Sequence, residues 1–137
     1  MTSATFVDTV AWLALVNKSD NLHKAACAVR DQLLQQKTKL ITTNFVAVEI
    51  ANSLARPPLR DVAIKLLNFI QTSTAVDLVT ITPELSEMAY KLYCSRPDKE
   101  WGLTDCTSFV VMKSMRLQRA FTADRHFEQD GFLLLLK

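Results

Sequence analysis

Four acidic residues that are far apart in the chain occupy positions that suit a shared metal site. Asp8 directly follows an apolar run, and Glu49 lies beside the apolar stripe of a helical segment. Asp105 opens a further helical segment, and Asp124 follows a short apolar run near the carboxyl terminus. Carboxylate oxygens favour hard divalent cations, and two such ions about 4 Å apart clamp the attacking and leaving oxygens of a phosphodiester. The four residues therefore indicate metal-dependent phosphodiester hydrolysis, which requires no histidine or cysteine nucleophile.

Each acid also has an ordinary structural explanation. Asp8 and Asp105 stand where an aspartate can cap a helix amino terminus, and Asp124 suits a turn. Glu49 is harder to explain, because a glutamate beside an apolar stripe is costly to bury without a cation or a proton. Its side chain can still reach solvent or pair with an arginine. The stripe beside it comprises Phe45, Val46, Ile50, Ser53 and Leu54.

Apolar periodicity divides the chain into alternating strands and helices. Short β-prone runs predict strands over residues 5–7, 40–42, 78–81, 120–122 and 131–136. Helical spacing predicts helices over residues 9–16, 21–37, 44–55, 59–70, 83–96 and 104–115. Thr82 is expected to cap the fifth helix, with Pro83 at its first position. Strands that alternate with helices are typical of an α/β sandwich with a mainly parallel sheet.

This architecture explains why the four scattered acids would meet. The carboxyl ends of parallel strands lie at one edge of the sheet, and the loops there form the binding site. All four carboxylates fall at positions that such a sheet gathers on that edge. Carboxylates brought this close repel one another, so they need protons or metal ions among them.

The size and charge of the chain agree with one ordinary globular domain. Of its 137 residues, 49% are hydrophobic and 22% are charged, which excludes a disordered chain. The formal net charge of +2 is too small to indicate a nucleic-acid partner by itself. If four of the 14 acids bind metal, however, 16 basic residues face only ten acids, which suits a polyanionic partner.

The sequence gives no reason to expect a targeting signal or a membrane segment. The first residues lack a basic region, and Asp8 interrupts the apolar run, so we expect no signal peptide. No apolar stretch is long enough to span a membrane. The cysteines Cys27, Cys94 and Cys106 match no metal-binding spacing and are expected to be reduced and buried. These features favour a cytoplasmic protein.

Four segments of the chain carry the motifs of a known family. They are Phe6-Val7-Asp8-Thr9, Thr42-Thr43-Asn44 through Val48-Glu49, Trp101-Gly102-Leu103-Thr104-Asp105-Cys106, and Phe121-Thr122-Ala123-Asp124-Arg125-His126-Phe127. The third segment is the most specific of these motifs. In these segments, and in the order and spacing of the four acids, the chain resembles the PIN-domain ribonucleases, and more narrowly the VapC-type toxins of bacterial toxin–antitoxin pairs. The resemblance covers essentially the whole chain, so we expect a single PIN domain over residues 1–137.

The resemblance implies a fold and an activity. The fold is a three-layer sandwich around a central parallel sheet of five strands, and the activity is Mg²⁺- or Mn²⁺-dependent endonucleolytic cleavage of single-stranded regions of RNA. By motif position, the catalytic metal ligands would be Asp8, Glu49, Asp105 and Asp124, the last either directly or through water. Hydrogen bonds to these ligands or to water are expected from Thr9, Thr104 and Thr122. Candidates for contact with RNA, each of which also suits an ordinary structural role, are Arg56, Lys99, Arg125 and His126.

The resemblance also implies protein partners. It predicts a homodimer and a tightly bound antitoxin, a segment of which would lie in an apolar groove near the metal site. Residues that can line this groove, although each can equally belong to the core, are Trp12, Leu13, Leu54, Leu59 and Leu66.

Competing interpretations fit the sequence less well. A phospho-accepting receiver domain needs paired acids after the first strand, where Asp8 stands alone, and a haloacid-dehalogenase-like phosphatase needs Asp-x-Asp, where Asp8-Thr9-Val10 is found. A dinucleotide-binding domain needs a glycine-rich loop, which the chain lacks. A stand-alone RNA-processing PIN nuclease remains an alternative to a toxin. A non-catalytic PIN-like binding module has no reason to keep four mutually repelling acids.

Overall fold

The computed structural model describes residues 3–137, so residues 1 and 2 of the expected single domain lie outside the described part. Its strands are β1 (Ala4–Val7), β2 (Lys39–Thr43), β3 (Val76–Val79), β4 (Arg119–Phe121) and β5 (Leu133–Leu134). Its helices are α1 (Thr9–Val16), α2 (His23–Gln35), α3 (Asn44–Ser53), α4 (Leu59–Thr72), α5 (Pro83–Ser95), α6 (Leu103–Ser114) and α7 (Arg125–Gln129).

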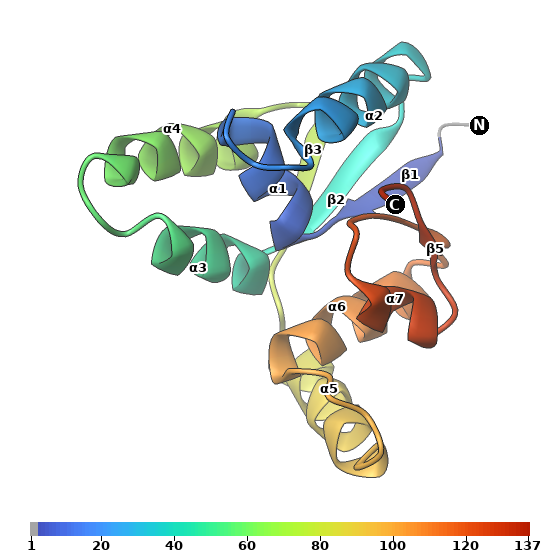
Figure 1. Cartoon of the computed structure of the whole chain (residues 1–137). Helices are drawn as coiled ribbons and strands as arrows, with labels where there is room; N and C mark the ends of the chain where they lie inside the picture. Colours follow the sequence, from blue (N-terminus) through green and yellow to red (C-terminus); the bar gives the residue numbers. More distant parts are fainter. Residues whose placement is uncertain (1–2) are drawn as a thin grey trace.

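The five strands form one sheet in the order β3-β2-β1-β4-β5, and every neighbouring pair is parallel. Helices α1, α2 and α4 group on one side of this sheet, and α5, α6 and α7 group on the other (Figure 1). The predicted three-layer α/β sandwich with a central parallel five-stranded sheet is therefore confirmed. Because β1 is the central strand, the residue that follows it emerges in the middle of the carboxyl edge.

The central strands are buried on both faces, as parallel strands covered by helices must be. Thr5, Phe6 and Val7 of β1 are all fully buried. Thr42 links β2 to β1 and α1. Its hydroxyl donates to the carbonyl oxygen of Val7 at 2.9 Å and accepts from Trp12 Nε1 at 3.3 Å. These bonds satisfy a hydroxyl that would otherwise be costly in the core.

Side-chain caps set where two helices begin. Thr43 Oγ1 accepts from the backbone N–H of Val46 at the start of α3, and Thr82 Oγ1 accepts from that of Leu85 at the start of α5. The second cap, with Pro83 in the first turn, confirms the start predicted for that helix. Among the helices of residues 3–137, none combines the length and apolar character needed to cross a membrane.

The structure differs from the sequence prediction near the sheet edges. The predicted strand 78–81 lies at Val76–Val79, because β3 pairs with β2 from Leu40 onward and the backbone N–H of Ile81 bonds to the Asn44 side chain instead. The predicted strand 131–136 is assigned only at Leu133–Leu134. Helix α7 was not predicted at all, since five residues are too few for an apolar period.

An aromatic cluster packs α6 against α7 and the end of the chain. Phe109 is fully buried, and its ring meets those of Trp101 and Phe127 edge-on at centroid distances of 5.1 and 4.9 Å. The ring of Phe132 completes the cluster at 5.8 Å from Phe109. Edge-to-face contacts of this kind stabilise beyond the area that they bury. The cluster matters for function because α6 and α7 each begin beside an acidic residue singled out above.

We predict that Phe109→Ala lowers the free energy of unfolding by about 3–5 kcal/mol, because it removes the centre of a close-packed cluster and leaves a cavity. Urea unfolding followed by circular dichroism measures the change. Phe69→Ala is the matched control, since Phe69 is 48% exposed and its loss leaves no enclosed cavity. An equal fall in the free energy of unfolding of the two variants would contradict the central role given to Phe109.

Candidate metal centre

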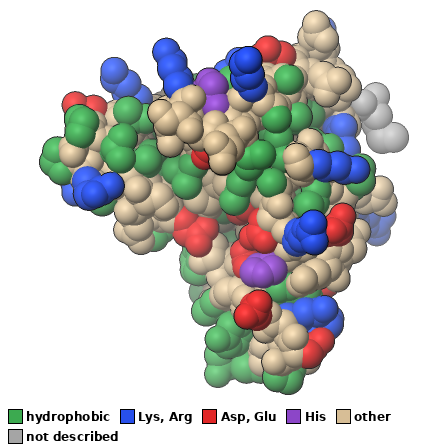
Figure 2. All heavy atoms as spheres, in the orientation of Figure 1, with side chains coloured by type: hydrophobic (Ala, Val, Ile, Leu, Met, Phe, Trp, Pro, Cys, Tyr) green, Lys and Arg blue, Asp and Glu red, His purple; other side chains and the backbone are tan. Residues whose placement is uncertain are grey.

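All four acids that the sequence singled out line one pocket at the carboxyl edge of the sheet. The pocket has a volume of about 430 Å³ and is lined by Asp8, Thr9, Val10, Glu49, Asn52, Ser53, Asp105 and Asp124. Figure 2 shows acidic side chains gathered in the notch between the two halves of the molecule, with a histidine beside them. The four acids come from four separate segments, and the parallel sheet brings them together.

Asp8 is the most buried of the four acids. Its side chain is only 4% exposed, and Thr122 Oγ1 donates to its Oδ2 at 2.9 Å. Asp8 precedes α1 but makes no side-chain cap to it, so the simple capping explanation does not apply. Burial raises the pKa of Asp8 to about 7, the Thr122 hydrogen bond opposes this, and the nearby Asp105 and Asp124 add to it.

Glu49 faces the pocket from α3. It accepts a hydrogen bond from Thr9 Oγ1 at 2.7 Å, and within residues 3–137 no arginine or lysine forms an ion pair with it. The apolar stripe beside Glu49 contains Val46, Ile50 and Leu54, which are buried. Ser53 does not belong to this stripe, contrary to the prediction, because it is exposed and lines the pocket.

Asn52 also lines the pocket, and sequence reasoning missed it. It lies three residues after Glu49, and Ser53 lies four residues after. Residues at these separations share one face of a helix. The helical spacing from Glu49 could therefore have identified both polar residues.

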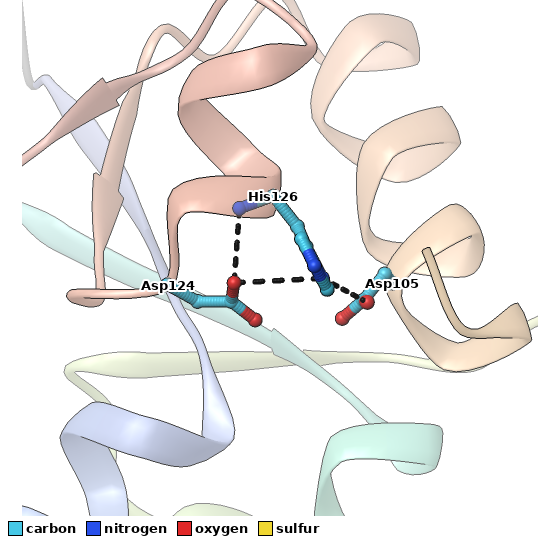
Figure 3. A group of neighbouring side chains, drawn as sticks. All are labelled: Asp105, Asp124 and His126. Atoms are coloured by element: carbon cyan, nitrogen blue, oxygen red, sulfur yellow. Dashed lines mark hydrogen bonds and ion pairs between the residues drawn. The ribbon is translucent and has the colours of Figure 1, made fainter. Parts of the chain in front are cut away.

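Asp105, Asp124 and His126 form the tightest part of the site (Figure 3). One ligand atom from each lies within 4.8 Å of the others. His126 Nδ1 is 3.1 Å from Asp105 Oδ2 and 3.5 Å from Asp124 Oδ1. Asp105 also accepts from the backbone N–H of Gly102, and Asp124 accepts from that of His126, so both acids cap helices as well.

Only two of the three threonines predicted to support the acids do so. Thr9 bonds to Glu49, and Thr122 bonds to Asp8 and accepts from the backbone N–H of Asp124. The bond predicted from Thr104 to a ligand is absent: in the described chain its hydroxyl bonds to none of the four acids, and its carbonyl oxygen accepts a bond from Thr107 Oγ1. Asp105 lines the pocket and Thr104 does not, so a bond from Thr104 to water stays a prediction.

The basic residues predicted near the site do not line it. Arg56 is exposed beyond the end of α3. Lys99 lines a different pocket, with Tyr93 and Trp101, and Arg125 lines a third, with Lys137. Among these candidates for RNA contact, only His126 reaches the acids, and it does so through Nδ1.

The cysteines have no part in this chemistry. Cys106 follows Asp105 but is buried, and burial raises the pKa of its thiol to about 11, so it stays protonated. Cys27 is half-buried and Cys94 is exposed, so the prediction that all three cysteines are buried was wrong for these two. All three are free thiols, as predicted.

The comparisons with known proteins agree with this geometry. The PIN-domain model matches residues 5–133, which is nearly the whole chain. The chain belongs to the PIN-domain family. Among its PIN-domain relatives, the 23S rRNA-specific endonuclease VapC20 of Mycobacterium tuberculosis is 32% identical over 129 residues, which cover 93% of this chain and 95% of the relative.

Three solved structures share the fold. The crystal structure of Mycobacterium tuberculosis VapC20, described as a sarcin–ricin loop cleaving toxin, has a TM-score of 0.84 at 30% identity and covers 95% of this chain and 97% of its own. VapBC2 from Rickettsia felis, bound to a promoter DNA fragment, has a TM-score of 0.72 at 10% identity, with 96% of each chain covered. FitAcB from Neisseria gonorrhoeae has a TM-score of 0.68 at 14% identity, with 95% of each chain covered.

This PIN domain also has an apolar pocket of about 370 Å³ between α1, α2, α4 and the sheet. Two of the predicted groove residues, Trp12 and Leu66, line it. The others do not, because Leu13 is half-buried elsewhere, Leu54 is core and Leu59 is exposed at the start of α4. Residues that complete the lining and that the sequence did not single out include Leu33, Leu34 and Phe69.

The donors of this PIN domain fit a hard divalent cation. Carboxylate oxygens from four segments face one pocket, and a buried carboxyl such as Asp8 needs either a proton or a cation. A bound cation would take the place of the proton that burial holds on Asp8 near neutral pH. All four acids line the pocket that would receive the metal, and of these four Asp105 and Asp124 belong to the group whose ligand atoms lie within 4.8 Å of one another.

We predict that Asp8 makes the metal-free protein less stable as the pH rises from about 4 to about 7, with no further loss above that. The folded-state pKa of Asp8, about 7, exceeds its ordinary value of 3.8, so in this interval the unfolded chain releases a proton that the folded protein keeps, and the free energy of unfolding falls. Asp8→Asn removes this loss and is expected to raise the free energy of unfolding at about pH 8 by on the order of 3 kcal/mol.

Urea unfolding in the presence of EDTA measures both proteins, and at about pH 4 they should agree. Asp61→Asn, which removes an exposed acid of α4, is the control for the loss of a negative charge. The prediction fails if the difference in free energy of unfolding between Asp8→Asn and the parent protein stays constant as the pH rises. That result would mean that burial does not disfavour the ionised form of Asp8.

Proposed function

We propose that this chain is a metal-dependent endoribonuclease, with Mg²⁺ or Mn²⁺ held by Asp8, Glu49, Asp105 and Asp124. The observation that carries the proposal is the convergence of these four acids, from four segments, on one pocket around a buried carboxyl. Four carboxylates this close repel one another, and a non-catalytic binding module has no use for that repulsion. Metal-dependent phosphodiester hydrolysis, in contrast, needs the cations that relieve it. The relationship to a named 23S rRNA endonuclease supports the same reaction.

The residues of the chain prepare the site for a phosphodiester. When bound, the metal lowers the pKa of a water molecule and neutralises charge that develops on the phosphate. Thr122 orients the Asp8 carboxylate, and Thr9 orients that of Glu49. The Gly102 backbone N–H holds Asp105 at the start of α6. These bonds fix the ligands before substrate arrives, which reduces the reorganisation needed during reaction.

RNA is the proposed substrate, and its single-stranded regions are the proposed sites of cleavage. The pocket is polar, which suits a backbone phosphate, and the preference for single-stranded regions rests on the resemblance to PIN-domain ribonucleases. The relative VapC20 is described as cleaving the sarcin–ricin loop, so a ribosomal RNA stem-loop is the first substrate to try. We further propose that the whole chain, residues 1–137, acts as a single domain in the cytoplasm.

We also propose that the chain is the toxin of a toxin–antitoxin pair and forms a homodimer. The apolar pocket lined by Trp12, Leu66 and Phe69 supports an antitoxin partner, because it offers an apolar anchor site on the surface. Exposed apolar side chains, including Val48, Tyr90 and Tyr93, support an interface between two copies. A short open reading frame abutting the gene upstream would support the antitoxin, and its absence would favour a stand-alone nuclease.

We predict that Asp8→Asn and Asp105→Asn each reduce RNA cleavage by on the order of 100-fold or more, because each removes a carboxylate that would hold the cation, and the cation neutralises the negative charge of the transition state. Cleavage of a labelled stem-loop RNA, resolved on a gel, measures the rate. Both variants are expected to keep the fold, as judged by circular dichroism and thermal unfolding. Asp61→Asn is the control and should cleave normally; a folded Asp105→Asn protein with full activity would refute the site.

We predict that EDTA stops cleavage and that added Mg²⁺ or Mn²⁺ restores it, because the four carboxylates require a divalent cation to act. Ca²⁺ is the control, since it binds carboxylates with longer, more flexible geometry and is expected to support cleavage poorly. Cleavage that persists in EDTA after dialysis would show that the chemistry does not depend on a metal.

A further inference from the structure

The metal site contains one donor that is not an oxygen. His126 places Nδ1 at 3.1 Å from Asp105 Oδ2 and 3.5 Å from Asp124 Oδ1, with its ring directed from α7 towards both acids (Figure 3). The chain has only two histidines, and the other, His23, lies on α2, where its Nδ1 is 2.7 Å from the carbonyl oxygen of Ala14. His126 is therefore the imidazole that can meet a cation in the pocket.

The distances between these donors match the edges of a coordination shell. Ligands about 2.1 Å from an ion lie about 3.0 Å apart when they subtend a right angle and about 3.4 Å apart at the tetrahedral angle. The two observed distances of 3.1 and 3.5 Å fall at these values. The three side chains could thus bind one ion with little movement.

The position of the imidazole is set by the backbone and the core. The backbone N–H of His126 donates to Asp124 Oδ1 at 2.9 Å, and this bond holds the first residues of α7 against the Asp124 side chain. The neighbouring Phe127 is fully buried against Phe109, so α7 cannot rotate without breaking the aromatic cluster. The His126 side chain is 30% exposed, which leaves the rest of the ring open to solvent. Nδ1 can bind a cation only in the tautomer that carries the ring proton on Nε2.

We propose that His126 Nδ1 is a direct ligand, together with Asp105 and Asp124, of one divalent ion, and that it shifts the preference of the site towards transition metals. The proposal rests on the proposed function in that it concerns the same pocket. Oxygen donors suit Mg²⁺, whereas an imidazole strengthens binding along the series from Mn²⁺ to Co²⁺ and adds little for Mg²⁺. Loss of His126 should therefore weaken Co²⁺ binding selectively.

A positioning role for His126 makes a different prediction. If Nδ1–H only donates to Asp105 and orients its carboxylate, its loss weakens binding of Mg²⁺ and Co²⁺ alike. His126→Asn separates the two roles, because the asparagine amide can place a hydrogen-bond donor near the position of Nδ1 but offers no imidazole nitrogen. His23→Asn is the matched control, since it removes the other imidazole, which lies away from the pocket.

Isothermal titration of tag-free protein with CoCl₂ and with MgCl₂ tests the proposal without RNA. For His126→Asn we expect Co²⁺ affinity to fall by at least about 10-fold, because even changes to the outer partners of a metal ligand cost this much. Mg²⁺ affinity is expected to stay within about 2-fold, and His23→Asn should match the parent protein for both ions. An equal loss for both ions, or no loss for Co²⁺, would overturn the proposal.

A second measurement avoids substitution at His126. In His23→Asn protein loaded with Mn²⁺, pulsed electron paramagnetic resonance should show the nuclear modulation of a bound imidazole nitrogen, and ¹⁵N-labelled histidine should alter it. Absence of a histidine nitrogen signal would overturn direct ligation. Both measurements stand apart from catalysis: selective Co²⁺ binding without RNA cleavage would support His126 as a ligand while refuting the nuclease proposal.

Discussion

Burial of the Asp8 carboxyl at the end of the central strand is the constraint on which the rest of the site depends. The Asp8 N–H bonds to the carbonyl oxygen of Phe121, so pairing of β1 with β4 continues into the pocket. The side chain is held in the buried position by its hydrogen bond from Thr122 Oγ1, and burial raises its pKa to about 7. The fold therefore holds a buried acid that a proton or a cation would satisfy, and the other three acids line the same pocket.

The hydrophobic core and the polar site are mechanically linked through helices α6 and α7. Asp105 stands in the first turn of α6 and Asp124 caps α7, so their separation depends on how these helices pack. The edge-to-face contact of Phe109 with Phe127 joins the two helices a few residues away from the acids. A close-packed core resists small shifts, so the packing of these two helices fixes how far apart the two carboxylates lie.

Much of the fold could be predicted because apolar spacing and helix caps act locally. The Thr82 cap and the central strands lay where the pattern placed them, since capping and burial depend on residues close together in the chain. The prediction of element bounds and side-chain positions failed where they depend on contacts with residues far away in the sequence. β3 begins at Val76, before the predicted start, because its register follows β2, and Ser53 left the predicted apolar stripe because α3 turns that face towards the pocket.

The sequence by itself determined the class of fold and the identity of the four acids. The spacing of apolar residues in strands and helices, and the order of the motifs, can be recognised from residues that are close together in the chain. Only the tertiary structure decided which other side chains join the acids. It placed Asn52 at the pocket and His126 beside Asp105 and Asp124, whereas Thr104, Arg56 and Lys99 do not line the pocket. The physical reason is that a side chain's direction depends on how its helix rotates against the sheet, and that rotation is set by packing between segments far apart in the chain.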